Sequence, residues 1–95
     1  IDLLSEKFVN NTERKIMDGD NKTEQLHFIW CAKEAIYKTL NGTPCSFKKN
    51  IYIEQVSNRK KTNAYYKCKN QVIKYEIYCE LFENYFIAIA NKNHD

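Results

Sequence analysis

Glu34 stands between two lysines, Lys33 and Lys38, in a stretch whose residue types could bind phosphate and metal. The stretch, Phe28–Lys38, has no Gly or Pro and is rich in Ala, Lys and Glu, which predicts a helix. A carboxylate is an oxygen ligand suited to Mg²⁺, and ammonium groups on either side can hold phosphate charge. An exposed helix face with an ordinary Glu34–Lys38 pair would give the same spacing, so both interpretations stay open.

Two faces of this helix are predicted from the residue spacing. Four apolar residues recur three or four positions apart and should face the core: Ile29, Ala32, Ile36 and Leu40. Trp30, Glu34 and Lys38 follow one another at intervals of four residues on another face. We expect Trp30 to pack behind the charged residues rather than to contact a substrate. His27 is expected to have no catalytic role.

The segment Trp30–Lys38 resembles the W-x-x-K-E-A-x-x-K signature of the 4'-phosphopantetheinyl transferase superfamily. Lys7–Glu13 is similar to the K-F-L-S-x-x-E segment that precedes this helix in the family. Tyr85–Ala90 is similar to the family's closing strand. The resemblance spans nearly the whole chain, although most of its specificity comes from the signature.

The resemblance implies an enzyme that transfers the 4'-phosphopantetheine group from its substrate coenzyme A to a serine of an acyl or peptidyl carrier protein. Mg²⁺ would be the cofactor, and fatty acid or polyketide biosynthesis would be the setting. Glu34 would bind Mg²⁺ and help to deprotonate the serine. Lys33 and Lys38 would bind coenzyme A phosphates, and Lys38 would also stabilise or protonate the leaving group.

The sequence departs from the family in one respect. Members carry an upstream G-x-D strand whose Asp supplies further metal ligands, and nothing in the chain matches it. Asp2 follows Ile1 in a superficially similar pair, but it lies only six residues before Phe8, too close to correspond. We therefore expect the rest of the site to come from another chain, as in an oligomer, or from the missing amino-terminal half of a longer protein.

Two other functions are compatible with the sequence. A non-catalytic remnant of the same fold would bind coenzyme A or a partner, and the missing Asp favours it. The second compatible function is that of a small RNA-binding α+β domain, because basic residues interspersed with aromatic ones can bind nucleic acid. Residues of these types occur together in the second half: Tyr65, Tyr66, Lys67, Lys69 and Lys74. They are more simply explained as strand residues, so no nucleic-acid partner is expected.

The chain as a whole predicts an α+β domain, with helices followed by a small antiparallel β-sheet on which the signature helix packs. This is the arrangement of a half-domain of the phosphopantetheinyl transferase kind. Helices are expected over residues 2–8, from 10 or 11 to 17, and from 21 or 23 to 40, where Asn41 and Gly42 stop the last. Strands are expected over residues 51–56, 64–69, 72–82 and 85–90, with turns at 57–63 and 83–84.

Composition sets the remaining expectations. The 95 residues, 43% of them hydrophobic, are typical of a single domain over residues 1–95. No run approaches the roughly 20 apolar residues of a membrane helix, and no signal-peptide pattern is present, so a cytoplasmic protein is expected. The net charge of +3 suits an anionic partner. The cysteines lack a C-x-x-C pair, which favours reduced thiols over a zinc site or a disulfide framework: Cys31, Cys45, Cys68 and Cys79.

Overall fold

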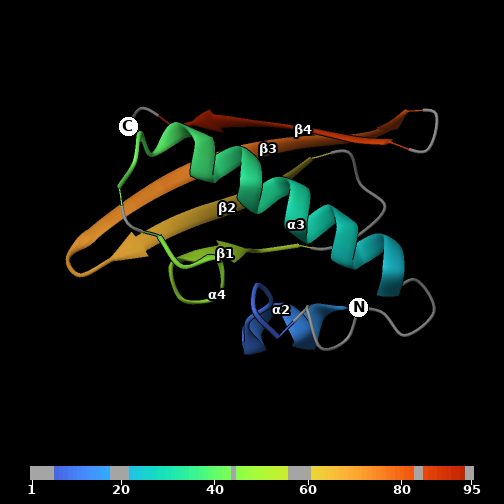
Figure 1. Cartoon of the computed structure of the whole chain (residues 1–95), viewed down its shortest axis with the longest axis horizontal. Helices are drawn as coiled ribbons and strands as arrows, with labels where there is room; N and C mark the ends of the chain where they lie inside the picture. The colour runs from blue at the N-terminus through green and yellow to red at the C-terminus, as the bar shows by residue number, and fades with distance from the viewer. Residues whose placement is uncertain (1–5, 18–21, 44, 56–60, 83–84, 94–95) are drawn as a thin grey trace.

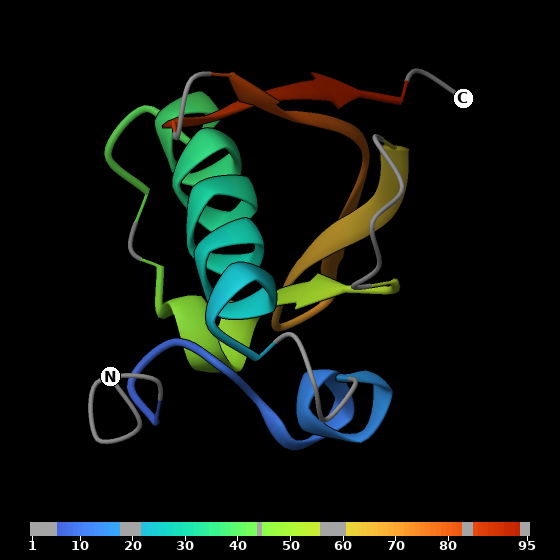
Figure 2. The same cartoon turned by 90° about the vertical axis from the view of Figure 1, so that its right-hand side faces the viewer.

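The computed structural model describes residues 6–17, 22–43, 45–55, 61–82 and 85–93. In chain order the elements are α2 (Asn11–Ile16), α3 (Lys22–Thr39), α4 (Phe47–Asn50), β1 (Ile51–Ile53), β2 (Lys61–Cys68), β3 (Gln71–Phe82) and β4 (Tyr85–Lys92). The strands form one antiparallel sheet in the order β1-β2-β3-β4. Helix α3 crosses one face of the sheet (Figure 1), which curves around it from β4 to β1 (Figure 2). The predicted α+β class is confirmed.

The ends of the helices follow from local sequence. A capping box begins α2: the Asn10 side chain accepts a hydrogen bond from the Glu13 N–H at 3.0 Å, and the Glu13 carboxylate accepts one from the Asn10 N–H at 3.1 Å. Helix α3 is followed by two residues in the left-handed region, Asn41 at φ 52° and Gly42 at φ 84°. The start of α2 at residue 10 or 11 and the stop at Asn41 and Gly42 were expected from the sequence, whereas the reciprocal bonds between Asn10 and Glu13 were not predicted.

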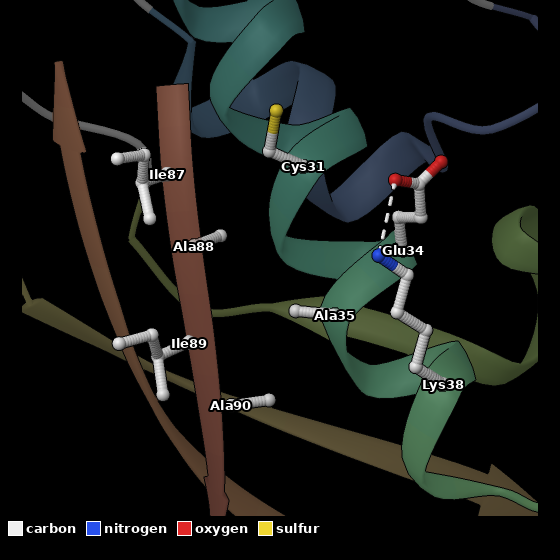
Figure 3. A pocket seen from close by; sticks show the side chains of 8 residues that line it. All are labelled: Cys31, Glu34, Ala35, Lys38, Ile87, Ala88, Ile89 and Ala90. Carbon is white, nitrogen blue, oxygen red and sulfur yellow. Dashed lines mark ion pairs between the residues drawn. The ribbon is translucent and has the colours of Figure 1, made fainter. Parts of the chain in front are cut away.

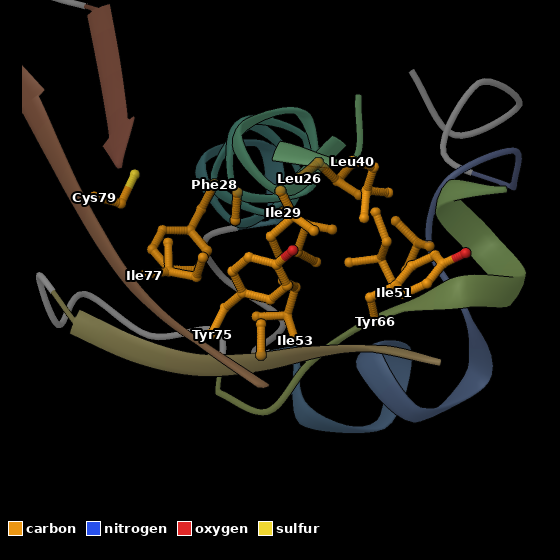
Figure 4. Close-up of a cluster of buried hydrophobic side chains, with 14 residues drawn as sticks. Leu26, Phe28, Ile29, Leu40, Ile51, Ile53, Tyr66, Tyr75, Ile77 and Cys79 are labelled. Atoms are coloured by element: carbon orange, nitrogen blue, oxygen red, sulfur yellow. The ribbon is translucent and has the colours of Figure 1, made fainter. Parts of the chain in front are cut away.

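The core lies between α3 and the sheet (Figure 4). The four apolar residues predicted to face inward are all buried, three of them on α3 and Leu40 directly after its end. On β3 the side chains alternate as in a strand with one buried face, because Tyr75, Ile77 and Cys79 are buried whereas Lys74 and Tyr78 are exposed. Burial of apolar surface at about 25 cal/mol per Å² therefore fixes which face of α3 and which face of the sheet meet.

The strands differ from the prediction in length. β1 ends at Ile53, and residues 61–63, which were predicted to be a turn, belong to β2. Every residue of β2 pairs with a residue of β3, and the Lys61 ammonium lies 3.0 Å from the Glu76 carboxylate on that strand. Cross-strand pairs of this kind stabilise strand residues whose own preference is weak. The predicted turn at 83–84 lies outside the described residues.

The helices also differ from the prediction at two places. The described part of the expected first helix, residues 6–8, forms a turn instead, and the rest of it lies outside the described residues. Helix α4 was not predicted. Its first turn is capped by the Ser46 hydroxyl, which accepts a hydrogen bond from the Lys49 N–H at 3.2 Å. A four-residue helix is too short to show a periodic apolar pattern, so only the cap residue could have indicated it.

The four cysteines are free thiols, as expected. Cys79 is buried on β3, and this burial, with a smaller effect from Cys31, raises the pKa of its thiol from 9.0 to about 11. Between these values the folded protein keeps the proton that the unfolded chain releases. The contribution of Cys79 to stability is therefore complete below pH 9.0 and is lost as the pH rises toward about 11.

We therefore expect Cys79→Ala to be less sensitive to alkali than the wild type. The measurement is the melting temperature of both proteins near neutral pH and at about pH 10.5, within the range where the thiol should titrate. The decrease between the two pH values should be smaller in the variant. Equal decreases would contradict the shifted pKa.

Among the described residues, no helix is both long and apolar enough to cross a membrane.

Candidate functional site

Helix α3 and the edge strand β4 enclose a pocket of about 390 Å³. Ala35 points from the helix toward β4, and Ala88 and Ala90 point back toward the helix (Figure 3). These small side chains let the two elements approach closely. The residues that line the pocket are Cys31, Glu34, Ala35, Lys38, Ile87, Ala88, Ile89 and Ala90. The pocket thus brings together the acid and one of the two lysines of the predicted site.

Glu34 and Lys38 form only a weak contact with each other. The carboxylate and the ammonium are 3.9 Å apart, and the side chains are 46% and 75% exposed. An exposed pair at this spacing contributes about 0.2–0.5 kcal/mol. Because little free energy holds the two groups together, either can exchange its partner for a phosphate or a metal ion at low cost.

Cys31 lies in the same pocket and was not predicted as a site residue. Burial, together with the neighbouring Glu34 carboxylate, raises the pKa of its thiol. The thiol therefore stays protonated near neutral pH and offers the pocket a small, weakly polar wall. Its position could have been inferred, since Cys31 precedes Glu34 by three residues and so lies one turn before it.

Lys33 lies inside the protein and does not line this pocket. Its side chain is fully buried, and the ammonium lies 2.7 Å from the carboxylate of Glu13, which is fully buried as well. The ammonium also donates hydrogen bonds to the backbone carbonyls of Phe8 and Phe47. A lysine has three N–H donors, and all three have acceptors here. The predicted contact with a coenzyme A phosphate would require Lys33 to give up one of them.

The Glu13 carboxylate is surrounded by hydrogen-bond donors, just as the Lys33 ammonium is surrounded by acceptors. Besides Lys33, it accepts hydrogen bonds from the backbone N–H groups of Asn10 at 3.1 Å and Ile53 at 2.8 Å. Burial raises the pKa of the Glu13 carboxyl and lowers that of the Lys33 ammonium, and the attraction between the two groups opposes both shifts. The pair therefore joins α2, α3 and β1 at one buried point.

Trp30 packs against its neighbours, as expected. Its ring meets Phe8 edge to face with centroids 5.3 Å apart and lies 5.2 Å from the ring of Phe47. These two residues are the ones whose carbonyls accept hydrogen bonds from Lys33. Although Trp30 is 42% exposed, its ring contacts the two residues that hold the Lys33 ammonium through their carbonyls. Its role in this structure is to hold the segments that surround Lys33.

The donor set at the pocket fits a metal ion only in part. Among the described residues, no group of three or more His, Cys, Asp or Glu side chains is placed to hold a metal. Glu34 is the one carboxylate among the described residues that line the pocket. Mg²⁺ commonly takes one or two protein carboxylates and completes its shell with phosphate oxygens and water. Glu34 therefore suits an ion that arrives with a phosphate, not one held by the protein alone.

Comparison with known proteins agrees with these features. Residues 1–90 match the family model of the 4'-phosphopantetheinyl transferase superfamily. No curated protein and no solved structure shows significant similarity to the chain. The matched residues include the whole of α3 and the pocket that it forms with β4. The chain thus belongs to the 4'-phosphopantetheinyl transferase superfamily, whose general reaction is phosphopantetheine transfer with coenzyme A as a substrate.

Proposed function

We propose that this chain takes part in the Mg²⁺-dependent transfer of 4'-phosphopantetheine from coenzyme A to a serine of an acyl or peptidyl carrier protein. The observation that carries the proposal is the exposed Glu34–Lys38 pair of α3, whose two residues are among those that line the pocket between this helix and β4. Membership of the superfamily supports the class of reaction. The reaction breaks one bond of a pyrophosphate and forms a new bond to the serine oxygen. Catalysis therefore depends mainly on positioning and on charge neutralisation.

Glu34 would serve as the metal ligand and as the proton acceptor. Its half-exposed carboxylate would bind Mg²⁺ together with the pyrophosphate oxygens, and the bound ion would neutralise charge on the phosphates. The same carboxylate would take the proton of the serine hydroxyl, directly or through a water molecule. Partial exposure supports both roles, since neither substrate could reach a buried carboxylate.

Lys38 and Lys33 would have different roles. The ammonium of Lys38 is 75% exposed and would hold the phosphates or stabilise the leaving group as a point cation. Lys33 would act as a positioning residue, because its three acceptors already hold it inside the protein. By fixing α3 against the segments around it, Lys33 would set the position of the adjacent Glu34.

The remaining metal ligands would come from outside the described residues. The family resemblance implies an additional strand that carries an Asp, and β4 offers a place for it. β4 lies at the edge of the sheet, pairs with β3 in the described part of the chain, and lines the pocket. A strand added along this edge would lie next to the pocket that Glu34 helps to line. A second copy, another protein or another part of a longer chain could supply it.

A second candidate function is coenzyme A binding without catalysis. Glu34 is the one carboxylate that the described part of the chain brings to the pocket, and this favours binding without catalysis, because a lysine can bind phosphate without a metal ion. The two functions differ in one measurable property. Transfer requires binding that depends on Mg²⁺ and on Glu34, whereas a lysine cradle binds coenzyme A without either.

Calorimetric titration of coenzyme A into the protein, with and without Mg²⁺, separates the two functions. We expect Mg²⁺ to strengthen binding in the wild type and Glu34→Gln to weaken it roughly tenfold or more, which corresponds to about 1.4 kcal/mol. Glu24→Gln is the matched control, because Glu24 is exposed in the first turn of the same helix. Binding that ignores both Mg²⁺ and Glu34 would contradict the transferase proposal.

The same variant should leave the fold unchanged. Among the described residues, the ion pair that Glu34 forms is the exposed one with Lys38, so Glu34→Gln should change the free energy of unfolding by no more than about 0.5 kcal/mol. Urea denaturation, followed by the fluorescence of Trp30, measures this. A loss of several kcal/mol would show that Glu34 has a structural role and that its effect on binding is indirect.

A further inference from the structure

Five residues form a surface that the proposed transferase site does not use. We call it the lysine–tyrosine patch, and its members are Lys49, Tyr52, Tyr65, Lys67 and Lys74. It occupies the face of the sheet opposite α3 and the adjoining end of α4. On β2, Ala64 and Tyr66 face the core and are buried, whereas Tyr65 and Lys67 alternate with them on the other face.

Strand pairing and side-chain contacts place these residues close together. Tyr65 pairs with Tyr52 on β1 and with Lys74 on β3. The two tyrosine rings are stacked, with centroids 4.9 Å apart and planes 13° from parallel. The Tyr52 hydroxyl donates a hydrogen bond to the Lys49 carbonyl at 3.0 Å, which brings α4 to the same surface.

The patch is positively charged. Its three lysines are exposed, and none forms an ion pair with another described residue. The acidic residues of this region lie two positions further along the chain: Glu54 follows Tyr52 just beyond the end of β1, and Glu76 follows Lys74 on β3. Glu76 is already paired with Lys61 at 3.0 Å. The patch therefore keeps an excess of positive charge beside two aromatic rings.

We propose that the lysine–tyrosine patch binds single-stranded nucleic acid. Lysines in such sites neutralise backbone phosphates, and aromatic rings provide surfaces on which bases stack whatever their sequence. An acidic polypeptide would also be attracted by the lysines, but the acidic side chains that would bind them carry no aromatic ring to stack on the tyrosine pair, whereas every nucleotide carries a base beside its phosphate. The rings thus favour a nucleic acid. Sequence spacing alone had grouped Tyr66 with these residues, but Tyr66 is buried and Tyr52 takes its place.

The test is fluorescence anisotropy with a labelled oligouridine of about 12 nucleotides, within the usual range of site sizes. Three phosphate contacts predict that log K falls with log salt concentration with a slope of about −2. We expect Lys67→Glu/Lys74→Glu to weaken binding more than tenfold and to flatten this slope. Lys7→Glu/Lys15→Glu is the matched control, because it changes the net charge equally at exposed residues outside the patch.

Tyr52→Leu separates stacking from charge. It should weaken binding several-fold and leave the salt slope unchanged, provided that its circular dichroism spectrum shows a folded protein. Absence of oligouridine binding at low salt would overturn the proposal, and so would an equal loss in the control variant. A labelled oligoglutamate that binds the wild type more tightly than the oligouridine, and loses binding in Lys67→Glu/Lys74→Glu, would overturn it in favour of an acidic protein.

Discussion

Glu13→Ala is expected to destabilise the protein by about 3–5 kcal/mol, because it leaves the Lys33 ammonium buried without a counter-charge. The change also removes the acceptor of the backbone N–H groups of Asn10 and Ile53. Lys33→Met should have an effect of similar size, since it leaves the Glu13 carboxylate buried and unpaired. Urea denaturation, followed by the fluorescence of Trp30, gives the free energy of unfolding of each variant.

Lys38→Met is the matched control for this prediction. It makes the same chemical change on the same helix, but at a side chain that is 75% exposed, so it should cost no more than about 0.5 kcal/mol. The double variant Glu13→Ala/Lys33→Met removes both charges at once. It should lose much less stability than the sum of the two single variants. Single variants that lose less than about 1 kcal/mol would show that the pair does not hold the fold.

Tyr75→Ala should destabilise the protein by a similar amount, about 3–5 kcal/mol, because it removes a large ring from the core. Tyr75 is fully buried on β3 and faces α3. Its hydroxyl lies 2.6 Å from that of Thr39, which donates to the Ile36 carbonyl at 2.7 Å. Tyr75 is therefore the donor in the contact with Thr39. The same urea titration measures the loss.

Tyr75→Phe separates the ring from the hydroxyl. It keeps the packing and removes one hydrogen bond, so it should cost about 1 kcal/mol. Thr39 keeps its bond to the Ile36 carbonyl in this variant, which limits the loss. If the two substitutions at Tyr75 were equally destabilising, the hydroxyl and not the ring would hold α3 against β3, contrary to our expectation.

The parts of the fold that could be predicted are those in which one regular pattern decides the outcome. The spacing of Ile29 and Ile36 indicates the buried face of α3, and the alternation along β3 indicates which of its residues face the helix. In both elements the apolar residues have a single layer of neighbours to pack against. The periodicity of the apolar residues was therefore sufficient to predict the buried face of each element, and the structure confirms that these residues are buried.

The parts that could not be predicted depend on contacts between distant segments. The start of β2 is set by its pairing with β3, and α4 is only one turn long. Lys33 is instructive, because it lies four residues after Ile29 and three before Ile36, on the buried face. Its burial could have been inferred from this spacing. Its partner could not, since Glu13 reaches it only through the tertiary fold.

The attachment of α2 has a consequence for the order of folding. Asn10 and Glu13 bind this helix to Ile51 and Ile53 through hydrogen bonds that span 41 and 40 residues of the chain. β2, β3 and β4, in contrast, pair with their neighbours in sequence, and such local contacts form early. We infer that α2 docks last. Until then both charges of the Glu13–Lys33 pair stay hydrated, so the cost of removing their water falls on the final step.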